Sequence, residues 1–325
     1  YVAFYYRDWK GVNRKKKKRG FRTKKEALEW EQKFKQRQAP SLDMLFSDFI
    51  EVYGEDMKPR LKYNTWLTKE HIIKTKLIPY FGQKKMNEIK ATDIIRWQNT
   101  LMEFRDENGI GYSKPYLRTI QAQLSAIFNH AIRLYELQSN PVHKAGGMGG
   151  ERQKKITVWT KEEYMKFSEA VWDKPQSFYA FEILYWAGLR VGELLALTAN
   201  DIDFEHKRIS VSKSYQRLQG EDYLTGPKTV RVNRIVDIPD FLCEELREYL
   251  GMLYGYMPDQ RIFQITKSYL HHELERGAKS AGVKRIRVHD LRHSHVSMLI
   301  DMGFTPVAIA ERMGHENIDI TMHYA

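Results

Sequence analysis

A glycine-rich stretch, NPVHKAGGMGGERQKK, occupies residues 140–155 and divides this chain into parts with different sequence patterns. It holds four glycines, has no apolar periodicity and ends in basic residues, a composition typical of a linker. The chain has 325 residues, enough for two or three domains with separate cores. We therefore expect a multidomain protein, mainly α-helical with small β-sheets, in which residues 143–155 form a linker.

The segment before the linker, residues 40–142, carries the periodicity of amphipathic helices. In SLDMLFSDFIEVY, residues 41–53, apolar side chains recur at the spacing of one helical face. We expect three further helices in TKEHIIKTKLIPYFG, in ATDIIRWQNTLMEF with Thr92 or Asp93 as cap, and in YLRTIQAQLSAIFNHAIRLY with Leu134 in its apolar stripe. The pattern predicts a four-helix, all-α domain.

Residues 1–39 form a small basic unit. YVAFYYRD is aromatic and strand-like, WKGVN is typical of a turn, and Thr23 can cap a following helix. We predict a β-hairpin followed by a helix, incomplete at its N-terminus because the sequence opens within the strand. Six consecutive cations lie on the hairpin: Arg14, Lys15, Lys16, Lys17, Lys18 and Arg19. They form either a solvated charge block or a DNA contact, and we favour DNA because a β-ribbon can enter a groove.

Composition narrows the function. The formal net charge is +12, with 53 Lys and Arg against 41 Asp and Glu, which favours a polyanionic partner. The single cysteine, Cys243, excludes an internal disulfide and a cysteine-rich zinc module, and it suits a reducing cytoplasm. No apolar run reaches the roughly 18 residues of a membrane span, so we expect no membrane segment.

The third domain is expected at residues 156–325, with a mixed α+β pattern. It opens with two helical segments, TKEEYMKFSEAVW and FYAFEILYWAG, and it ends in helices. Between them, TVRVNRIVDIP places Val230, Val232, Val236 and Ile238 on one face of a strand. Together with RISVSKSY, this strand predicts a small antiparallel sheet.

Two cations of this domain occupy distinctive positions. In AGLRVGELLAL, Arg190 lies at a joint between two helices, where Glu193 can orient it. Alone, this pattern favours a structural Arg–Glu pair at a helix junction over a functional one. Lys228 follows the Gly226-Pro227 turn and begins the strand after a hairpin tip, while Lys213 on the preceding strand is an alternative.

The stretch VHDLRHSHVSMLI, residues 288–300, concentrates histidines. On a helix, His289 and His293 lie one turn apart, a spacing that suits a metal ion, but no HExxH or cysteine cluster supplies a third ligand. His289 and Arg292, three residues apart, can instead grip one phosphate. We therefore expect no metal site, and we assign His293 and His295 to helix packing.

The end of the chain reads ERMGHENIDITMHYA. Gly314 is expected to stop a helix, which leaves His315 at the helix end, and Tyr324 follows nine residues later. The ordered set of AGLRVGEL, a hairpin lysine, HDLRHS, MGH and TMHYA resembles the tyrosine recombinase (phage integrase) family, in particular the integrases of conjugative transposons and temperate phages of Gram-positive bacteria. The resemblance covers the whole chain.

The resemblance implies an arm-site DNA-binding domain at 1–39, a helical core-binding domain at 40–142 and a catalytic domain at 156–325. It also implies a covalent 3′-phosphotyrosine intermediate in the integration or excision of a mobile element, without metal or cofactor. Tyr324 would be the nucleophile and Lys228 the general acid, with Glu193 in support of Arg190. The remaining catalytic residues would be Arg190, His289, Arg292 and His315, arranged around one phosphate.

The expected partners follow from this resemblance. They are double-stranded DNA at core and arm sites, further copies of the chain in a tetramer, and an excisionase or DNA-bending protein, in the bacterial cytoplasm at the nucleoid. Two alternatives stay open: a type IB topoisomerase, which shares the chemistry, and a non-catalytic DNA-binding regulator with the same fold.

Overall fold

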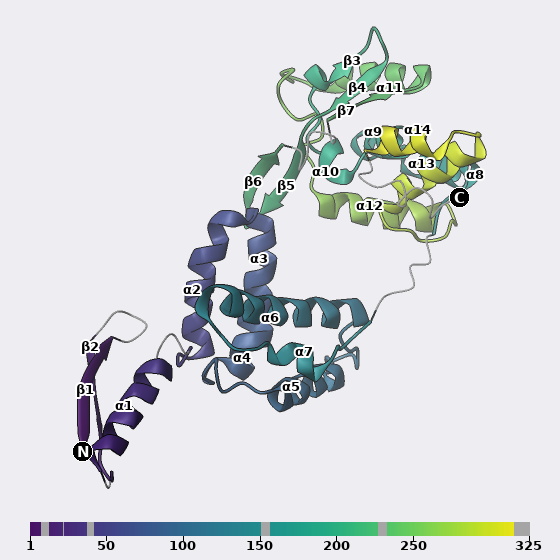
Figure 1. The fold of residues 1–325 in the computed structure, drawn as a ribbon. Helices are drawn as coiled ribbons and strands as arrows, with labels where there is room; N and C mark the ends of the chain where they lie inside the picture. The colour runs from purple at the N-terminus through teal and green to yellow at the C-terminus, as the bar shows by residue number, and fades with distance from the viewer. Residues whose placement is uncertain (8–12, 22, 38–41, 151–156, 227–232, 315–325) are drawn as a thin grey trace. The chain divides into compact units, whose positions relative to one another are not determined.

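The computed structural model describes residues 1–7, 13–21, 23–37, 42–150, 157–226 and 233–314. The chain divides into two compact units, Tyr1–Gln153 and Lys154–Ala325, and Figure 1 traces the elements of each. Among the described residues, no helix has the length and apolar character needed to cross a bilayer.

The first unit opens with the predicted hairpin and helix. Strands β1 (Val2–Arg7) and β2 (Asn13–Lys18) pair antiparallel in a register that sets Val2 opposite Lys18. Helix α1 (Lys24–Arg37) begins after Thr23, whose Oγ1 accepts a hydrogen bond from the Glu26 amide at 3.1 Å. Phe4 is buried, and its ring lies 6.1 Å from that of Trp30 on α1. One face of the hairpin therefore packs on the helix.

The helical part of the first unit confirms the all-α prediction. Its main helices are α2 (Phe46–Met57), α3 (Tyr63–Ile72), α4 (Ile78–Phe81), α5 (Ala91–Glu103), α6 (Lys114–Tyr135) and α7 (Pro141–Ala145). A 3₁₀ turn, η1 (Lys58–Arg60), follows α2, and a π turn, η2 (Ile73–Leu77), joins α3 to α4. The core is aromatic, with Phe46, Phe49, Phe81, Trp97 and Phe128 almost fully buried.

Three local predictions in this part were wrong. Helix α2 begins at Phe46 rather than at Ser41, because Met44 and Phe46 pair by backbone hydrogen bonds with the segment at 84–86. The N-cap residue of α5 is Lys90 rather than Thr92 or Asp93. Asp93 is the third residue of the helix, and its side chain accepts a hydrogen bond from the Lys90 amide at 3.0 Å. Leu134 is 50% exposed, whereas Tyr135 beside it packs against the core, so the apolar stripe of α6 does not include Leu134.

The predicted linker is mostly packed structure. Its first part forms the end of α7, and the glycines beyond it lie against α5 and α6. Gln98 Nε2 donates to the Gly146 carbonyl at 2.9 Å, and the Met148 amide donates to Gln121 Oε1 at 2.6 Å. Met148 is buried. The expectation of a linker over 143–155 therefore fails for residues 143–150, and residues 151–155 lie outside the described part.

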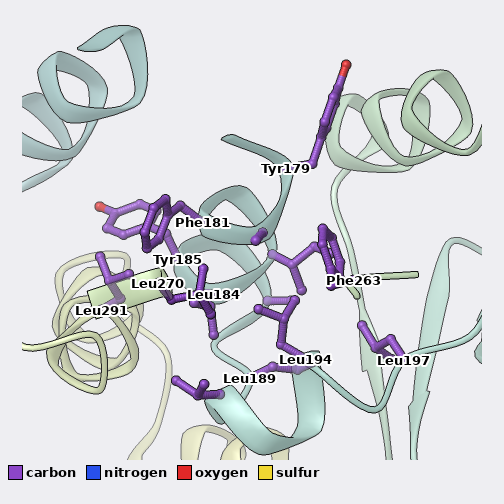
Figure 2. Close-up of a cluster of buried hydrophobic side chains, with 14 of the residues drawn as sticks. Tyr179, Phe181, Leu184, Tyr185, Leu189, Leu194, Leu197, Phe263, Leu270 and Leu291 are labelled. Atoms are coloured by element: carbon purple, nitrogen blue, oxygen red, sulfur yellow. The ribbon is translucent and has the colours of Figure 1, made fainter. Parts of the chain in front are cut away.

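The second unit has helices around two small sheets, as the α+β prediction requires. The helices are α8 (Lys161–Val171), α9 (Pro175–Glu182), the π turn η3 (Ile183–Ala187), α10 (Val191–Leu194), the 3₁₀ turn η4 (Ala199–Asp201), α11 (Asp240–Met252), α12 (Lys267–Ser280), α13 (Asp290–Asp301) and α14 (Pro306–Met313). Figure 2 shows the core, where Leu184, Leu194 and Phe263 converge.

The strands of this unit form two antiparallel sheets. The first has the order β3 (Ile202–Asp203), β4 (Arg208–Val211), β7 (Arg234–Asp237), and the second pairs β5 (Ser214–Leu218) with β6 (Glu221–Thr225). Val236 is buried opposite Ile209, as the alternation predicted. Val230 and Val232 lie outside the described residues. Lys213 occupies the short link between β4 and β5 rather than a strand.

Candidate active site

Arg190 is held at a sharp joint between two helices. Gly188 ends the π turn with φ +65°, and a Cβ there would come within 2.5 Å of the His295 ring, so the close approach of α13 requires glycine. Arg190 is the N-cap residue of α10. Its backbone amide and its Nη1 each donate to Glu193 at 2.8 Å, and its Nη2 donates to the Gly314 carbonyl at 3.3 Å. The guanidinium is thus fixed in place by the carboxylate predicted to orient it.

Glu193 is shared by a second arginine that the sequence analysis did not single out. Arg234, at the start of β7, donates from Nη1 to Oε1 at 3.0 Å and from Nη2 to Oε2 at 2.7 Å. Burial by itself raises the pKa of Glu193, but the hydrogen bond and charge of Arg234 and the charge of Arg190 outweigh it and bring the pKa to about 2. Glu193 is therefore a permanent anion with two cationic partners.

Arg234 also reaches the end of α14. Its side chain is 6% exposed, and its Nε donates to the Arg312 carbonyl at 2.9 Å. A sequence signal for it existed, because Arg234 shares the inward parity of Val236 and Ile238 in the alternation of β7. A cation at an inward position needs a buried anion, and Glu193 is that anion.

Arg292 lies in the first turn of α13 and is 3% exposed. Its Nη1 donates to the Gly188 carbonyl at 2.7 Å, and its Nη2 donates to the Met313 carbonyl. The glycine turn that precedes Arg190 therefore also holds Arg292. The two arginines of the predicted phosphate clamp both donate to carbonyls at the end of α14, Arg190 to Gly314 and Arg292 to Met313, although they are about a hundred residues apart in the chain.

His289 is the N-cap residue of α13 and keeps an exposed surface. Desolvation of its ring, the neighbouring His293 and the charge of Arg292 lower the pKa of His289 to about 4. The His289 and His293 rings meet edge to face, with centroids 4.9 Å apart. The imidazole of His289 is consequently neutral at physiological pH and can accept a proton.

His293 and His295 have packing environments, as predicted. His295 is 1% exposed, and its Nε2 accepts a hydrogen bond from Arg312 Nε at 3.1 Å. Burial and the charges of Arg312 and Arg292 lower the pKa of His295 to about 3. His293 Nε2 lies 3.9 Å from Asp290 Oδ1. Among the described residues, no cluster of three or more His, Cys, Asp or Glu side chains is arranged to hold a metal.

Three predicted catalytic residues, Lys228, His315 and Tyr324, lie outside the described residues. Gly314 ends α14 with φ +62°, and its carbonyl accepts a hydrogen bond from Arg190. The alternative lysine, Lys213, is paired with a carboxylate and a hydroxyl. Its Nζ lies 2.8 Å from Asp201 Oδ2 and 3.2 Å from Thr198 Oγ1.

The cations of the hairpin are divided between two faces. Opposite residues of an antiparallel pair share a face, so Lys16 and Lys18 lie on the side of Phe4, toward α1. Lys15 and Lys17 lie on the other side with Tyr5, which is 67% exposed. Their Nζ atoms lie 5.6 Å from the Tyr5 centroid and 4.8 Å from the Tyr1 centroid, respectively. Arg19 is exposed beyond β2, and the side chain of Arg14 lies outside the described part.

Three domain families match successive parts of the chain. The Arm DNA-binding domain matches residues 1–38, the phage integrase N-terminal SAM-like domain matches residues 45–102, and the phage integrase family matches residues 157–325. The ICEBs1 integrase of Bacillus subtilis strain 168 is 31% identical over 324 residues, covering 92% of this chain and 85% of its own length.

Solved structures share the fold. A Tn1549 transposon integrase in complex with transposon right end DNA superposes with a TM-score of 0.72 at 21% identity, covering 86% of this chain and 94% of the other. A lambda integrase tetramer bound to a Holliday junction gives a TM-score of 0.63 at 16% identity, covering 98% and 91% of the two chains. At these identities the likeness concerns the fold.

Proposed function

We propose, because this chain belongs to the phage integrase family of tyrosine recombinases, that Arg190 and Arg292 bind the DNA phosphate that Tyr324 attacks. The chain is a site-specific recombinase that serves the integration of a mobile element. The observation that supports the residue assignment is that Arg292 and Arg190 donate to the adjacent carbonyls of Met313 and Gly314, near a histidine whose pKa is lowered to about 4.

The proposed chemistry is a transesterification at phosphorus. The Tyr324 hydroxyl forms a bond to phosphorus, the bond from phosphorus to the 5′ oxygen breaks, and the 3′-phosphotyrosyl link conserves the ester for rejoining. Neutral His289 accepts the tyrosine proton, and Lys228 protonates the departing 5′ oxygen. Arg190, Arg292 and His315 bind the non-bridging oxygens, where preorganised cations stabilise the developing charge.

We further propose that Arg234 is a positioning residue for Arg190. If Arg190 moves from Glu193 toward a phosphate, Glu193 keeps both of its hydrogen bonds to Arg234 and is not left as an unpaired buried charge. The cost of releasing Arg190 is therefore small. Since Arg190 is 37% exposed and Arg234 is 6% exposed, Arg190 is the one placed to reach DNA.

The first unit is proposed to bind DNA as well. On the β1–β2 hairpin, Lys15 and Lys17 with the exposed Tyr5 are suited to contact an arm site, since this face is not covered by α1. The helical part of the unit is proposed to bind the core site beside the cleavage point. A tetramer on DNA, an excisionase or DNA-bending partner, and a cytoplasmic, nucleoid-associated location complete the proposal.

A type IB topoisomerase would use the same chemistry without a second DNA site. Purified protein should be given one supercoiled plasmid and, separately, a plasmid with two attachment sites. We expect site-dependent strand exchange in the second plasmid, and loss of exchange when the arm sites are deleted. Relaxation of any supercoiled plasmid at equal rate, with no exchange product, would reject recombination in favour of the topoisomerase. A regulator would bind DNA and leave both plasmids uncut.

A further inference from the structure

The second unit carries a cavity of about 550 Å³ that contains none of the proposed catalytic residues. It lies among α8, α9, the following π turn and α11. The side chains that line it are aromatic or acidic for the most part: Trp172, Phe178, Trp186 and Phe241, with Glu169, Glu182 and Glu245. The three glutamates in this lining contrast with the net charge of the whole chain, which is +12.

The walls of this groove are exposed aromatic rings. Trp172 is 62% exposed and Phe241 is 41% exposed, both large apolar side chains with open ring faces. Trp172 meets Phe178 edge to face at 4.5 Å, and Phe241 meets Trp186 in the same way at 5.2 Å. Such pairs fix the orientation of the rings, so the groove is built before any ligand arrives.

The floor of the groove is acidic and lacks a full set of partners. Glu182 is 4% exposed, and its Oε1 accepts hydrogen bonds from Tyr164 at 2.7 Å and Ser168 at 2.6 Å. Glu245 Oε2 is buried and finds no hydrogen-bond partner among the described residues. Burial, together with the charges of Glu182 and Glu248, raises the pKa of Glu245 to about 7. A cation at this point would repay the desolvation of Glu245.

One lysine of the chain lies at the rim of the groove. Lys161 Nζ lies 5.9 Å from the centroid of the Trp186 ring, within the range of a cation–π contact. Nucleic acid is a poor occupant because the three carboxylates would repel phosphate. A purely apolar segment is also poor, since it would cover Glu245 without pairing its Oε2.

We propose that this groove binds a lysine or arginine side chain carried on an apolar segment of a partner protein. The cation lies against Glu245, the alkyl stem lies along Trp186 and Phe241, and the apolar neighbours of the cation cover Trp172 and Met165. Aromatic walls with a carboxylate floor match the two halves of such a side chain. The site goes beyond the recombination activity and gives the second unit a protein-binding surface.

The direct test uses n-butylammonium as the probe, with n-butanol as the neutral control, on the full chain by saturation-transfer NMR. At pH 8 we expect butylammonium to bind and butanol to bind at least tenfold more weakly. Between pH 8 and pH 6 the butylammonium affinity should fall about tenfold, because a carboxyl that titrates near pH 7 loses its charge in this range. Glu245→Gln should weaken binding at pH 8 and remove the pH dependence.

Glu205→Gln, an exposed acidic residue between β3 and β4, is the matched control and should bind as wild type does. Equal affinities for butylammonium and butanol, or unchanged binding in Glu245→Gln, would overturn the proposal. A concentration-dependent dimer that Glu245→Gln abolishes would make the occupant a second copy of this chain, and would overturn its assignment to a different protein. Covalent DNA cleavage by Glu245→Gln should stay at the wild-type level, which separates this test from that of the recombinase site.

Discussion

At the scale of single residues, the site depends on how one buried carboxylate is shared. Glu193 accepts the Arg190 guanidinium through one oxygen, the Arg190 amide through the other and Arg234 through both, and its pKa falls to about 2. Removing one partner of a buried anion lowers the stability of the folded protein strongly, because the anion is left unpaired. Replacing the anion together with its partner can leave the stability nearly unchanged. The arrangement predicts that Arg234 and Glu193 are energetically coupled.

This coupling can be measured with a double-mutant cycle. Arg234→Met should lower the free energy of unfolding by about 3 kcal/mol, because Glu193 loses its most buried partner. Glu193→Gln combined with Arg234→Met should recover a substantial part of that loss. The cleavage rate should fall about 10- to 100-fold in Arg234→Met, since Arg190 must stay on Glu193. Arg234→Lys keeps the charge and should recover part of the rate.

Chemical denaturation of the wild type, Glu193→Gln, Arg234→Met and the double variant measures the free energies of unfolding. Single-turnover cleavage measures the rates. Additive effects of the two substitutions on unfolding would show that Glu193 and Arg234 act independently. A full cleavage rate in a folded Arg234→Met protein would remove Arg234 from the proposed set of positioning residues.

The titration of His289 gives a second prediction at this scale. In the free protein, the ring protons should hold nearly constant chemical shifts from pH 8 to pH 5, with a midpoint near 4, because desolvation and the charge of Arg292 disfavour the imidazolium. An NMR titration checks this, with His289→Asn used to assign the resonance. A midpoint near the ordinary value of about 6.5 would mean that the surroundings of His289 do not disfavour its imidazolium, and would contradict this prediction.

At the scale of elements, the hairpin divides a charge run that the sequence presents as uniform. Strand alternation sends Lys15 and Lys17 to the open face and Lys16 and Lys18 toward α1, where Lys18 Nζ lies 4.9 Å from the Trp30 centroid. The two pairs carry the same charge, but they differ in what lies beside them. Their comparison therefore separates a DNA contact from a general effect of net charge.

The Lys15→Ala, Lys17→Ala double variant should weaken arm-site binding and reduce the slope of log affinity against log salt by about 2, because each phosphate contact contributes about 0.9. The Lys16→Ala, Lys18→Ala variant is the matched control and should change the slope by less. Fluorescence anisotropy with a labelled arm-site duplex over a salt series measures both. Equal changes in the two variants would mean that the hairpin acts only through its total charge.

The elements also show which parts of the fold were predictable. Helical periodicity located α2, α5 and α6, because apolar stripes reflect burial against a shared core. The same reasoning failed where backbone pairing with a distant segment overrides it, as at Met44 and Met86. It failed again at the glycines of 146–150, since their packing depends on carbonyl and amide contacts with Gln98 and Gln121 that no side-chain pattern records.

At the scale of the whole molecule, the candidate site combines segments that are distant in sequence. Arg190 and Arg292 were predicted from their motifs, whereas Arg234 became apparent only from its contacts with Glu193 and with the end of α14. The fold decides which charged side chain meets another in the interior, and one sequence alone does not reveal that pair. The order of the motifs predicted the family, and the contacts add the residue that supports Arg190.

The proposed recombinase depends on a covalent bond that Tyr324 forms with DNA at the site built by Arg190 and Arg292. The most direct measurement incubates the protein, in EDTA, with nicked duplexes from the ends of its mobile element and isolates SDS-resistant adducts. We expect a 3′-phosphotyrosyl peptide containing Tyr324 by mass spectrometry, no adduct in Tyr324→Phe, and a loss of about 100- to 1000-fold in rate for Arg190→Ala. An adduct that persists in Tyr324→Phe, or that maps to another tyrosine, would contradict it.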